Sequence, residues 1–328
     1  MDTRERVEDL WFEDGNLILQ AENSLFRIYS GLLASRSSVF SDMLAFPPPE
    51  EGNPMMDGCH IVVVYDSAKD MTVFLKAILD SRYDCNSFHV SYPLTLIILS
   101  YFEPPPTPTQ LHIVEGVLRL SLKYDVQYLR QRAMKHLTST FPHTFNNWKS
   151  RDSLRTIPPI DNTPFAAFRI ATEFQFTWLL PSILYCMSSH PIEKTLDGVQ
   201  WQDDHLELSW VDKRMALIGR AKILASQSRK AVTMAKVAGI PAEGCRDINC
   251  SLMRARCADT VGLWEIAGIL DYFEDNSEAY SANFCSKCLM SFKEQCEDVG
   301  RSFWEELPGM FELPGWTELE RHKVLSSD

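Results

Sequence analysis

Residues 10–44, LWFEDGNLILQAENSLFRIYSGLLASRSSVFSDML, constrain the fold of this chain more than any other segment. Two short apolar strand patterns come first, and the Glu22-Asn23 pair between them predicts a hairpin turn, with Asn23 tolerating the left-handed conformation. Two apolar clusters at helical spacing follow, and Ser37 is placed to cap the second helix. Because no catalytic or ligand-binding motif interrupts this order, the segment indicates a compact interaction module.

The strand and helix patterns continue beyond this segment. Residues 61–65 form the clearest strand pattern in the chain, with four β-branched residues followed by a tyrosine. After it, Ser67 and Asp70 have the spacing of a capping box. The helix that they would start carries one apolar stripe, made of Met71, Phe74, Leu75, Ile78 and Leu79.

Two more helical patterns complete the first part of the chain, at 111–122 and 126–137. Residues 1–140 therefore predict three strands and about five helices, in the order hairpin, helix, helix, strand, helix, helix, helix. This combination is typical of an α+β domain.

The second part of the chain has a different pattern. Residues 141–163 are polar and contain three prolines, which predicts a linker. Residues 164–328 carry helical patterns and no strand pattern, and Pro181 stands where the first turn of a helix tolerates proline. We therefore expect a mainly α-helical C-terminal domain.

Composition narrows the classes of protein to which the chain can belong. The 328 residues are enough for two domains, and a net charge of −12 leaves no basic face for nucleic-acid phosphates. The charged N-terminus lacks the apolar core of a secretory signal, and the longest apolar run, at 94–99, is too short to span a membrane. Nine cysteines without an export signal favour reduced thiols or metal ligands. We expect a cytoplasmic or nuclear protein that binds neither membranes nor nucleic acid directly.

The first 140 residues contain the motifs FRIY at 26–29, LLASRS at 32–37 with Phe40, and LRLSLKYDV at 118–126 with Leu129. These motifs resemble the BTB/POZ domain, and the segments LWFEDGN, DSRY and FEPPP are similar to those of expanded fungal-type BTB proteins. The resemblance is specific over residues 8–83 and 102–140. It departs at Tyr29, where BTB domains usually carry a structural histidine.

Residues 84–101, DCNSFHVSYPLTLIILSY, are an atypical insertion, since the family pattern runs from DSRY almost directly into FEPPP. One hypothesis is that they are translated read-through of a short retained intron. The other is a genuine surface insertion, which adds little loop-closure entropy. If translated, the uncharged apolar run at 94–99 predicts a tendency to aggregate.

The cysteines are the strongest candidates for site chemistry. Cys285 and Cys288 form a C-x2-C pair, and Cys245 and Cys250 form a looser pair upstream, so the four thiolates could hold a structural zinc ion. However, Cys285 and Cys296 also belong to an apolar stripe at helical spacing that runs to Phe303. On that pattern they are packed free thiols, and this interpretation is the favoured one.

The sequence gives less support to redox chemistry, nucleophilic cysteine catalysis or histidine acid–base catalysis. A redox C-x2-C motif works at a helix start in a βαβ unit, and the second half shows no strand pattern. Nucleophilic cysteine catalysis needs a positioned base, and the eight histidines have no partner spacing. His205, beside two aspartates, is expected at a solvated helix start. We therefore predict no catalytic residues.

The resemblance implies a non-enzymatic protein that acts through protein–protein interaction. BTB domains self-associate or bind partners such as cullin-type ubiquitin-ligase scaffolds and transcriptional co-regulators, and residues 164–328 would then recruit a client. The alternatives are a scaffold or oligomerisation protein without a ligase role, and a zinc- or thiol-dependent regulatory protein. No cofactor is expected apart from the structural zinc that the four cysteines would hold.

Overall fold

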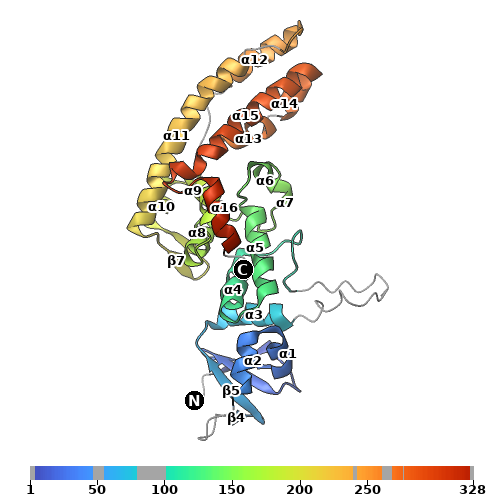
Figure 1. The fold of residues 1–328 in the computed structure, drawn as a ribbon, viewed down its shortest axis with the longest axis vertical. Helices are drawn as coiled ribbons and strands as arrows, with labels where there is room; N and C mark the ends of the chain where they lie inside the picture. Colours follow the sequence, from blue (N-terminus) through green and yellow to red (C-terminus); the bar gives the residue numbers. More distant parts are fainter. Residues whose placement is uncertain are drawn as a thin grey trace, which may run out of the picture. The chain divides into compact units, whose positions relative to one another are not determined.

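The computed structural model divides the chain into two compact units, which we describe separately (Figure 1). Unit 1 contains Met1–Thr140 and Leu154–Pro158, and unit 2 contains Phe141–Ser153 and Pro159–Asp328. The residues that the structure describes are 4–46, 55–79, 101–238, 242–260, 268–275 and 277–325. The atypical insertion at 84–101 lies outside these residues, apart from Tyr101.

Unit 1 is built on a five-stranded sheet with the order β1-β3-β2-β5-β4. β2 and β3 form the predicted antiparallel hairpin, while β5 runs parallel to β2 and β1 runs parallel to β3. The sequence did not reveal β1, because Leu10 is its one buried residue and the rest of this edge strand is charged or partly exposed. The strands are β1 (Glu5–Trp11), β2 (Leu17–Ala21), β3 (Ser24–Ile28), β4 (Met55–Met56) and β5 (Cys59–Val64).

The turn of this hairpin differs from the prediction in one residue. Glu22 rather than Asn23 has the left-handed conformation, with a φ of 50°. The Glu22 carboxylate accepts a hydrogen bond of 3.1 Å from the backbone N–H of Ala68, at the start of α3 (Ala68–Leu79). A carboxylate is stabilised at a helix N-terminus, and this contact offsets part of the cost of a positive φ.

The helices of unit 1 follow the predicted order in the described residues, with two helices before β5 and three after it. Together with the sheet they confirm the α+β fold class. Helix α3 packs against α4, and α4 packs against α5. The helices are α1 (Ser30–Arg36), α2 (Ser38–Ala45), α3, α4 (Leu111–Lys123) and α5 (Gln127–Thr140).

Both predicted helix caps are present. The Ser37 hydroxyl accepts a hydrogen bond of 3.1 Å from the backbone N–H of Phe40, and the Ser67 hydroxyl accepts one of 3.0 Å from Asp70. The Asp70 carboxylate pairs with Arg119 at 2.6 Å. Four residues of the predicted α3 stripe are fully buried, while Leu79 is partly exposed; the four are Met71, Phe74, Leu75 and Ile78.

Residues 141–163 do not form the linker that their composition predicted. They include α6 (Phe145–Lys149) and α7 (Arg151–Leu154), and Trp148 is 3% exposed. Its ring centroid lies 5.3 Å from that of Tyr185 and 5.3 Å from that of Trp304. A single anchoring tryptophan decides where such a segment packs, whereas composition averages over all of its residues.

The later part of the same segment returns to unit 1. Ile157 is 1% exposed, and its backbone N–H donates to the hydroxyl of Thr140 at 3.3 Å. The Thr156 hydroxyl lies 2.7 Å from Nδ1 of the buried His136. These contacts give residues 154–158 a fixed place in unit 1, which a linker would not have.

Unit 2 is mainly helical, as predicted for residues 164–328. Pro181 lies in the first turn of its helix, also as predicted. The helices after α7 are α8 (Thr163–Glu173), the 3₁₀ helix η2 (Thr177–Leu179), α9 (Leu180–Ser188), α10 (Ile192–Asp197), α11 (Trp210–Ala238), α12 (Ile248–Thr260), α13 (Gly268–Asp275), α14 (Ser277–Asn283), α15 (Ser286–Met310) and α16 (Trp316–Leu325).

A short hairpin also lies in unit 2, so the prediction of no strands in this half was wrong. It pairs β6 (Val199–Trp201) with β7 (Asp204–Leu206), and three-residue strands leave too short a pattern to detect. His205 lies in β7 and not at a helix start, with its Nε2 3.0 Å from the carbonyl oxygen of Asp197.

The part of unit 2 that carries the cysteines is a set of helices around one apolar core. Helix α11 packs along α15, and α12 packs against α14 (Figure 1). Helix α13 also contributes to the buried cluster that we call the aromatic–thiol core. Its members are Met234, Cys250, Met253, Cys257, Tyr272, Phe273, Tyr280, Phe284, Cys288, Phe292 and Cys296. Within the described ranges, no helix combines the length and apolarity needed to cross a membrane.

Candidate metal centre

Four thiols of unit 2 converge at one end of the aromatic–thiol core. The Sγ atoms of Cys245, Cys250, Cys285 and Cys288 all lie within 4.8 Å of one another. Cys250 and Cys288 are buried, and the other two are partly exposed. In the described part of the chain, this is the one group of three or more His, Cys, Asp or Glu side chains gathered as metal ligands would be. The two predicted cysteine pairs thus meet in space, and we name them the four-thiol group.

The first pair is presented by the turn between α11 and α12. Gly244 has a φ of 77°, a conformation that suits glycine, and it lies directly before Cys245. Asp247 then caps the start of α12, since its carboxylate accepts a hydrogen bond of 2.9 Å from the backbone N–H of Asn249. Cys250 lies in the first turn of the helix, so a tight turn and a helix start bring the two thiols to one side.

The second pair lies at the start of α15. Cys285 is the N-cap residue, with φ and ψ of −66° and 158°, and Cys288 lies in the first helical turn. Cys285 therefore precedes α15, and it is partly exposed where it packs against the aromatic–thiol core. Cys296 is 7% exposed within that core, as the packed-thiol interpretation predicted. For Cys285, the contact with the core fits a packed thiol and the place in the four-thiol group fits a metal ligand.

Sulfur distances within the four-thiol group rule out a disulfide in this structure. The Sγ atoms of Cys245 and Cys285 are 3.8 Å apart, whereas a disulfide bond is about 2.05 Å long. Cysteines outside the insertion are all free thiols in the described residues. A Zn–S bond of about 2.3 Å in a tetrahedron places sulfur atoms about 3.8 Å apart. The Cys245–Cys285 separation therefore equals that of a tetrahedral thiolate site, and the other separations are at most 4.8 Å.

Hydrogen-bond donors are directed at these sulfur atoms. The backbone N–H of Cys285 donates to the Sγ of Cys250 at 3.1 Å, and the guanidinium of Arg254 donates to the Sγ of Cys288. The backbone N–H of Cys288 is the largest influence that lowers the pKa of Cys285, to about 7. Burial acts in the opposite direction and raises the pKa of Cys250 and of Cys288.

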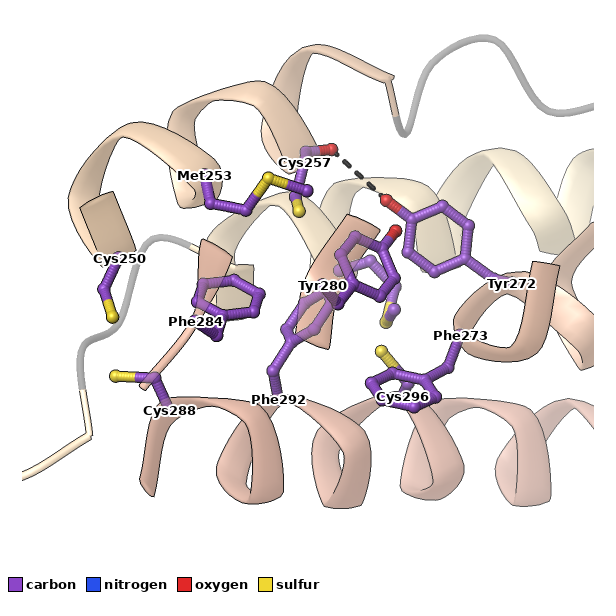
Figure 2. Close-up of a cluster of buried hydrophobic side chains, with 11 residues drawn as sticks. Cys250, Met253, Cys257, Tyr272, Phe273, Tyr280, Phe284, Cys288, Phe292 and Cys296 are labelled. Atoms are coloured by element: carbon purple, nitrogen blue, oxygen red, sulfur yellow. Dashed lines mark hydrogen bonds between the residues drawn. The ribbon is translucent and has the colours of Figure 1, made fainter. Parts of the chain in front are cut away.

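Figure 2 shows where the buried pair lies in the core. The sulfur atoms of Cys250 on α12 and Cys288 on α15 face the same space, next to the ring of Phe284. Cys296 lies further along α15, and it does not belong to the four-thiol group. The buried ring of Phe284 therefore packs beside the buried pair of the group.

Arg254 is the site residue that the sequence did not indicate. It is 7% exposed, and its Cζ lies 5.9 Å from the centroid of the Phe284 ring. It follows Cys250 by four residues on α12, so the two share a helix face. That spacing was the available signal, but an i, i+4 cysteine–arginine pair is too common to single out.

The chemistry open to this group follows from its donors. Among the described residues, the group contains four thiols and neither a histidine nor a carboxylate, the side chains that serve as the general base of a catalytic cysteine. Four sulfur ligands without an open position are typical of structural zinc sites. Comparisons of the chain with protein-family models, with curated proteins and with solved structures found no match.

Proposed function

We propose that this protein is a non-catalytic adaptor that acts through protein–protein interaction in the cytoplasm or nucleus. Unit 1 is a BTB/POZ-like domain in this proposal. It would self-associate or bind a cullin-type ubiquitin-ligase scaffold or a transcriptional co-regulator, and unit 2 would recruit a client. The observation that carries the proposal is that the β2–β3 hairpin, β5 and the five helices of unit 1 follow the order predicted from the sequence patterns of the segment whose motifs resemble this family.

The contacts between those motifs give further support. Phe40, from the first motif, stacks on Tyr124 from the later one, with ring centroids 4.2 Å apart. The Ser37 hydroxyl also donates to the carbonyl oxygen of Tyr124 at 2.5 Å. The segments that carry the resemblance therefore pack as parts of a single core. At the departure from the family pattern, the Tyr29 hydroxyl donates to Asp14 at 2.6 Å, a contact of the surface.

Unit 1 also exposes large apolar side chains that a partner would cover. Tyr65, just after β5, is 94% exposed, and Phe46, just after α2, is 75% exposed. Aromatic side chains contribute much of the binding free energy at protein interfaces. We therefore propose that these two residues contribute to the partner-binding surface of unit 1.

Affinity purification of the tagged full-length chain from cell extract, with mass spectrometry of bound proteins, tests the proposal. The comparison includes the double variant Phe46→Ser/Tyr65→Ser and, as a control, Trp210→Ser, which changes an aromatic of unit 2 that is 73% exposed. We expect the wild type and the control to recover equal amounts of the same partner. The double variant should recover at least several-fold less of that partner. Equal recovery with all three proteins would rule out the proposed surface.

The alternatives give different results in the same experiment. Recovery of a cullin supports the ligase adaptor, and its absence while other partners are enriched contradicts the ligase role. Self-association without any other partner, measured by light scattering of the purified chain, favours the oligomerisation protein. A monomer that enriches no protein above an untagged control would overturn the adaptor proposal itself.

A further inference from the structure

We infer that the four-thiol group is a structural Zn²⁺ site that links the start of α12 to the start of α15. The ligands would be the Sγ atoms of Cys245, Cys250, Cys285 and Cys288. This inference goes beyond the adaptor role and does not depend on it.

The first observation is the geometry of the sulfur donors. The two pairs have the spacings C-x4-C and C-x2-C, both within the range of structural zinc sites. They come from two separate segments, yet every sulfur lies within 4.8 Å of the other three. Ligands supplied two by two, from a turn and from a helix start, are common in structural zinc domains.

The second observation is the buried cation beside the thiols. Arg254 is 7% exposed, and its guanidinium donates to the Sγ of Cys288. Among the described residues no carboxylate forms an ion pair with it. A buried charge is costly unless an opposite charge neutralises it, and a neutral thiol supplies none. Four thiolates around Zn²⁺ carry a net charge of −2, so a loaded site would give Arg254 a negative partner.

The hydrogen bond from the backbone N–H of Cys285 to the sulfur of Cys250 also favours the thiolate state. Cys285 donates to the Sγ of Cys250 at 3.1 Å, and a thiolate is a much stronger acceptor than a thiol. Hydrogen bonds to the ligand atoms are the usual second layer of a metal site. Apolar packing requires only the volume of a thiol, and it gives no reason for such donors.

The donor set selects zinc among the common metals. Soft thiolates favour zinc, copper(I) and iron–sulfur clusters over magnesium or calcium. Sulfur atoms all within 4.8 Å surround one ion and leave no room for the bridging sulfides of a multi-iron cluster. Four ligands complete the tetrahedron that zinc prefers, so no position remains for a substrate, and the role is structural.

A zinc ion bound to the four thiols would also fix the conformation of the turn at 242–247. Cys245 lies outside any helix, and its backbone N–H donates to the carbonyl oxygen of Ala242 at 3.0 Å. Metal binding and local folding are coupled in such sites, since the unfolded chain does not hold the ligands together. Zinc binding would therefore order this turn and the first turn of α12 together.

The direct test is the zinc content of the full-length protein, purified from zinc-supplemented cells and measured by mass spectrometry of the metal. We expect about one zinc per chain in the wild type. Cys288→Ala and Cys296→Ala form a matched pair, because both cysteines are buried in the same core on α15. Cys288→Ala should lose the zinc and Cys296→Ala should keep it. Equal zinc content in the two variants, or none in the wild type, would overturn the inference.

A second measurement remains informative if Cys288→Ala does not fold. The wild type is stripped with a chelator at neutral pH and titrated with Co²⁺, whose sulfur charge-transfer absorption reports thiolate ligands. We expect saturation at one Co²⁺ per chain and displacement by Zn²⁺. Hydrogen exchange of the zinc-free protein should rise at residues 242–260 and stay unchanged in α8 and α9. A Co²⁺ spectrum without thiolate absorption contradicts the site.

Discussion

The guanidinium of Arg254 donates a hydrogen bond to the Sγ of Cys288, and both side chains are buried although 34 positions separate them in the chain. Helix α12 thus delivers a thiol, Cys250, and a cation, Arg254, to the same end of α15. The cation lies where it would neutralise part of the charge of a metal–thiolate centre. Its contribution can be measured separately from that of the ligands.

Replacing Arg254 by methionine should weaken zinc binding by about tenfold or more, because outer residues of metal sites typically contribute factors of about 10–100. Methionine keeps much of the volume and removes the charge. Competition with a chromogenic chelator measures the affinity. Arg256→Met on the same helix is the control, since that side chain is exposed. Equal affinities in the two variants would mean that Arg254 does not act on the site.

Asp271 predicts a pH dependence of stability in unit 2. Its carboxylate accepts a hydrogen bond of 3.2 Å from the indole nitrogen of Trp148, and burial raises its pKa to about 6 from 3.8. The folded state holds the proton of Asp271 more tightly than the unfolded state does. The favourable contribution of this protonated carboxyl group to the free energy of unfolding is therefore complete below about pH 4 and is lost as the pH rises through 6.

Asp271→Asn should therefore leave the free energy of unfolding unchanged near pH 4 and increase it by up to about 3 kcal/mol at pH 7.5. The asparagine side chain can keep the oxygen that accepts from Trp148. Denaturant unfolding of both proteins at several pH values gives the difference directly. Asp298→Asn, at an exposed carboxylate of α15, is the control. A difference that does not change between pH 4.5 and 7.5 would show that Asp271 does not titrate with a raised pKa.

Ser37→Ala should destabilise unit 1 by about 1–2 kcal/mol, because it removes a helix cap and leaves the carbonyl of Tyr124 without this donor. Ser38→Ala is the matched control, since the Ser38 hydroxyl bonds the exposed carboxylate of Asp125. We expect less than about 0.5 kcal/mol for that change. Thermal unfolding followed by circular dichroism compares them, and equal losses would contradict the role of Ser37.

Gly219 is a packing position of α11 that no larger residue should occupy. A Cβ atom there would overlap the ring of Phe311, which is itself fully buried. Gly219→Ala should therefore cost about 1–3 kcal/mol, despite the better helix propensity of alanine. Gly309→Ala meets no atom within 4 Å and should be neutral or stabilising. The denaturant midpoints of the two variants measure these changes in stability. A stabilising effect of Gly219→Ala would show that Phe311 can move aside.

Local sequence patterns were sufficient for most of unit 1. The hairpin, the caps at Ser37 and Ser67 and the buried stripe of α3 all depend on residues close together in the chain. Strand β1 and the packing of the 141–163 segment were not predicted, because their positions depend on a few contacts with distant residues. Trp148, for example, is buried against Tyr185 and Trp304, and nothing nearby in the chain marks it as an anchor.

In the four-thiol group, too, some features follow from the local sequence and others from contacts between distant residues. The sequence alone determined which thiols could act together, because C-x2-C and C-x4-C pairs present their sulfur atoms from short local turns. It favoured packed thiols for Cys285, because the spacing to Cys296 fits a helical stripe. Only the tertiary structure brings Cys285 next to Cys245, since α15 begins one residue after Cys285, at Ser286. Which sulfur atoms share one space depends on how α12 packs beside α15, and local periodicity carries no information on contacts between distant helices.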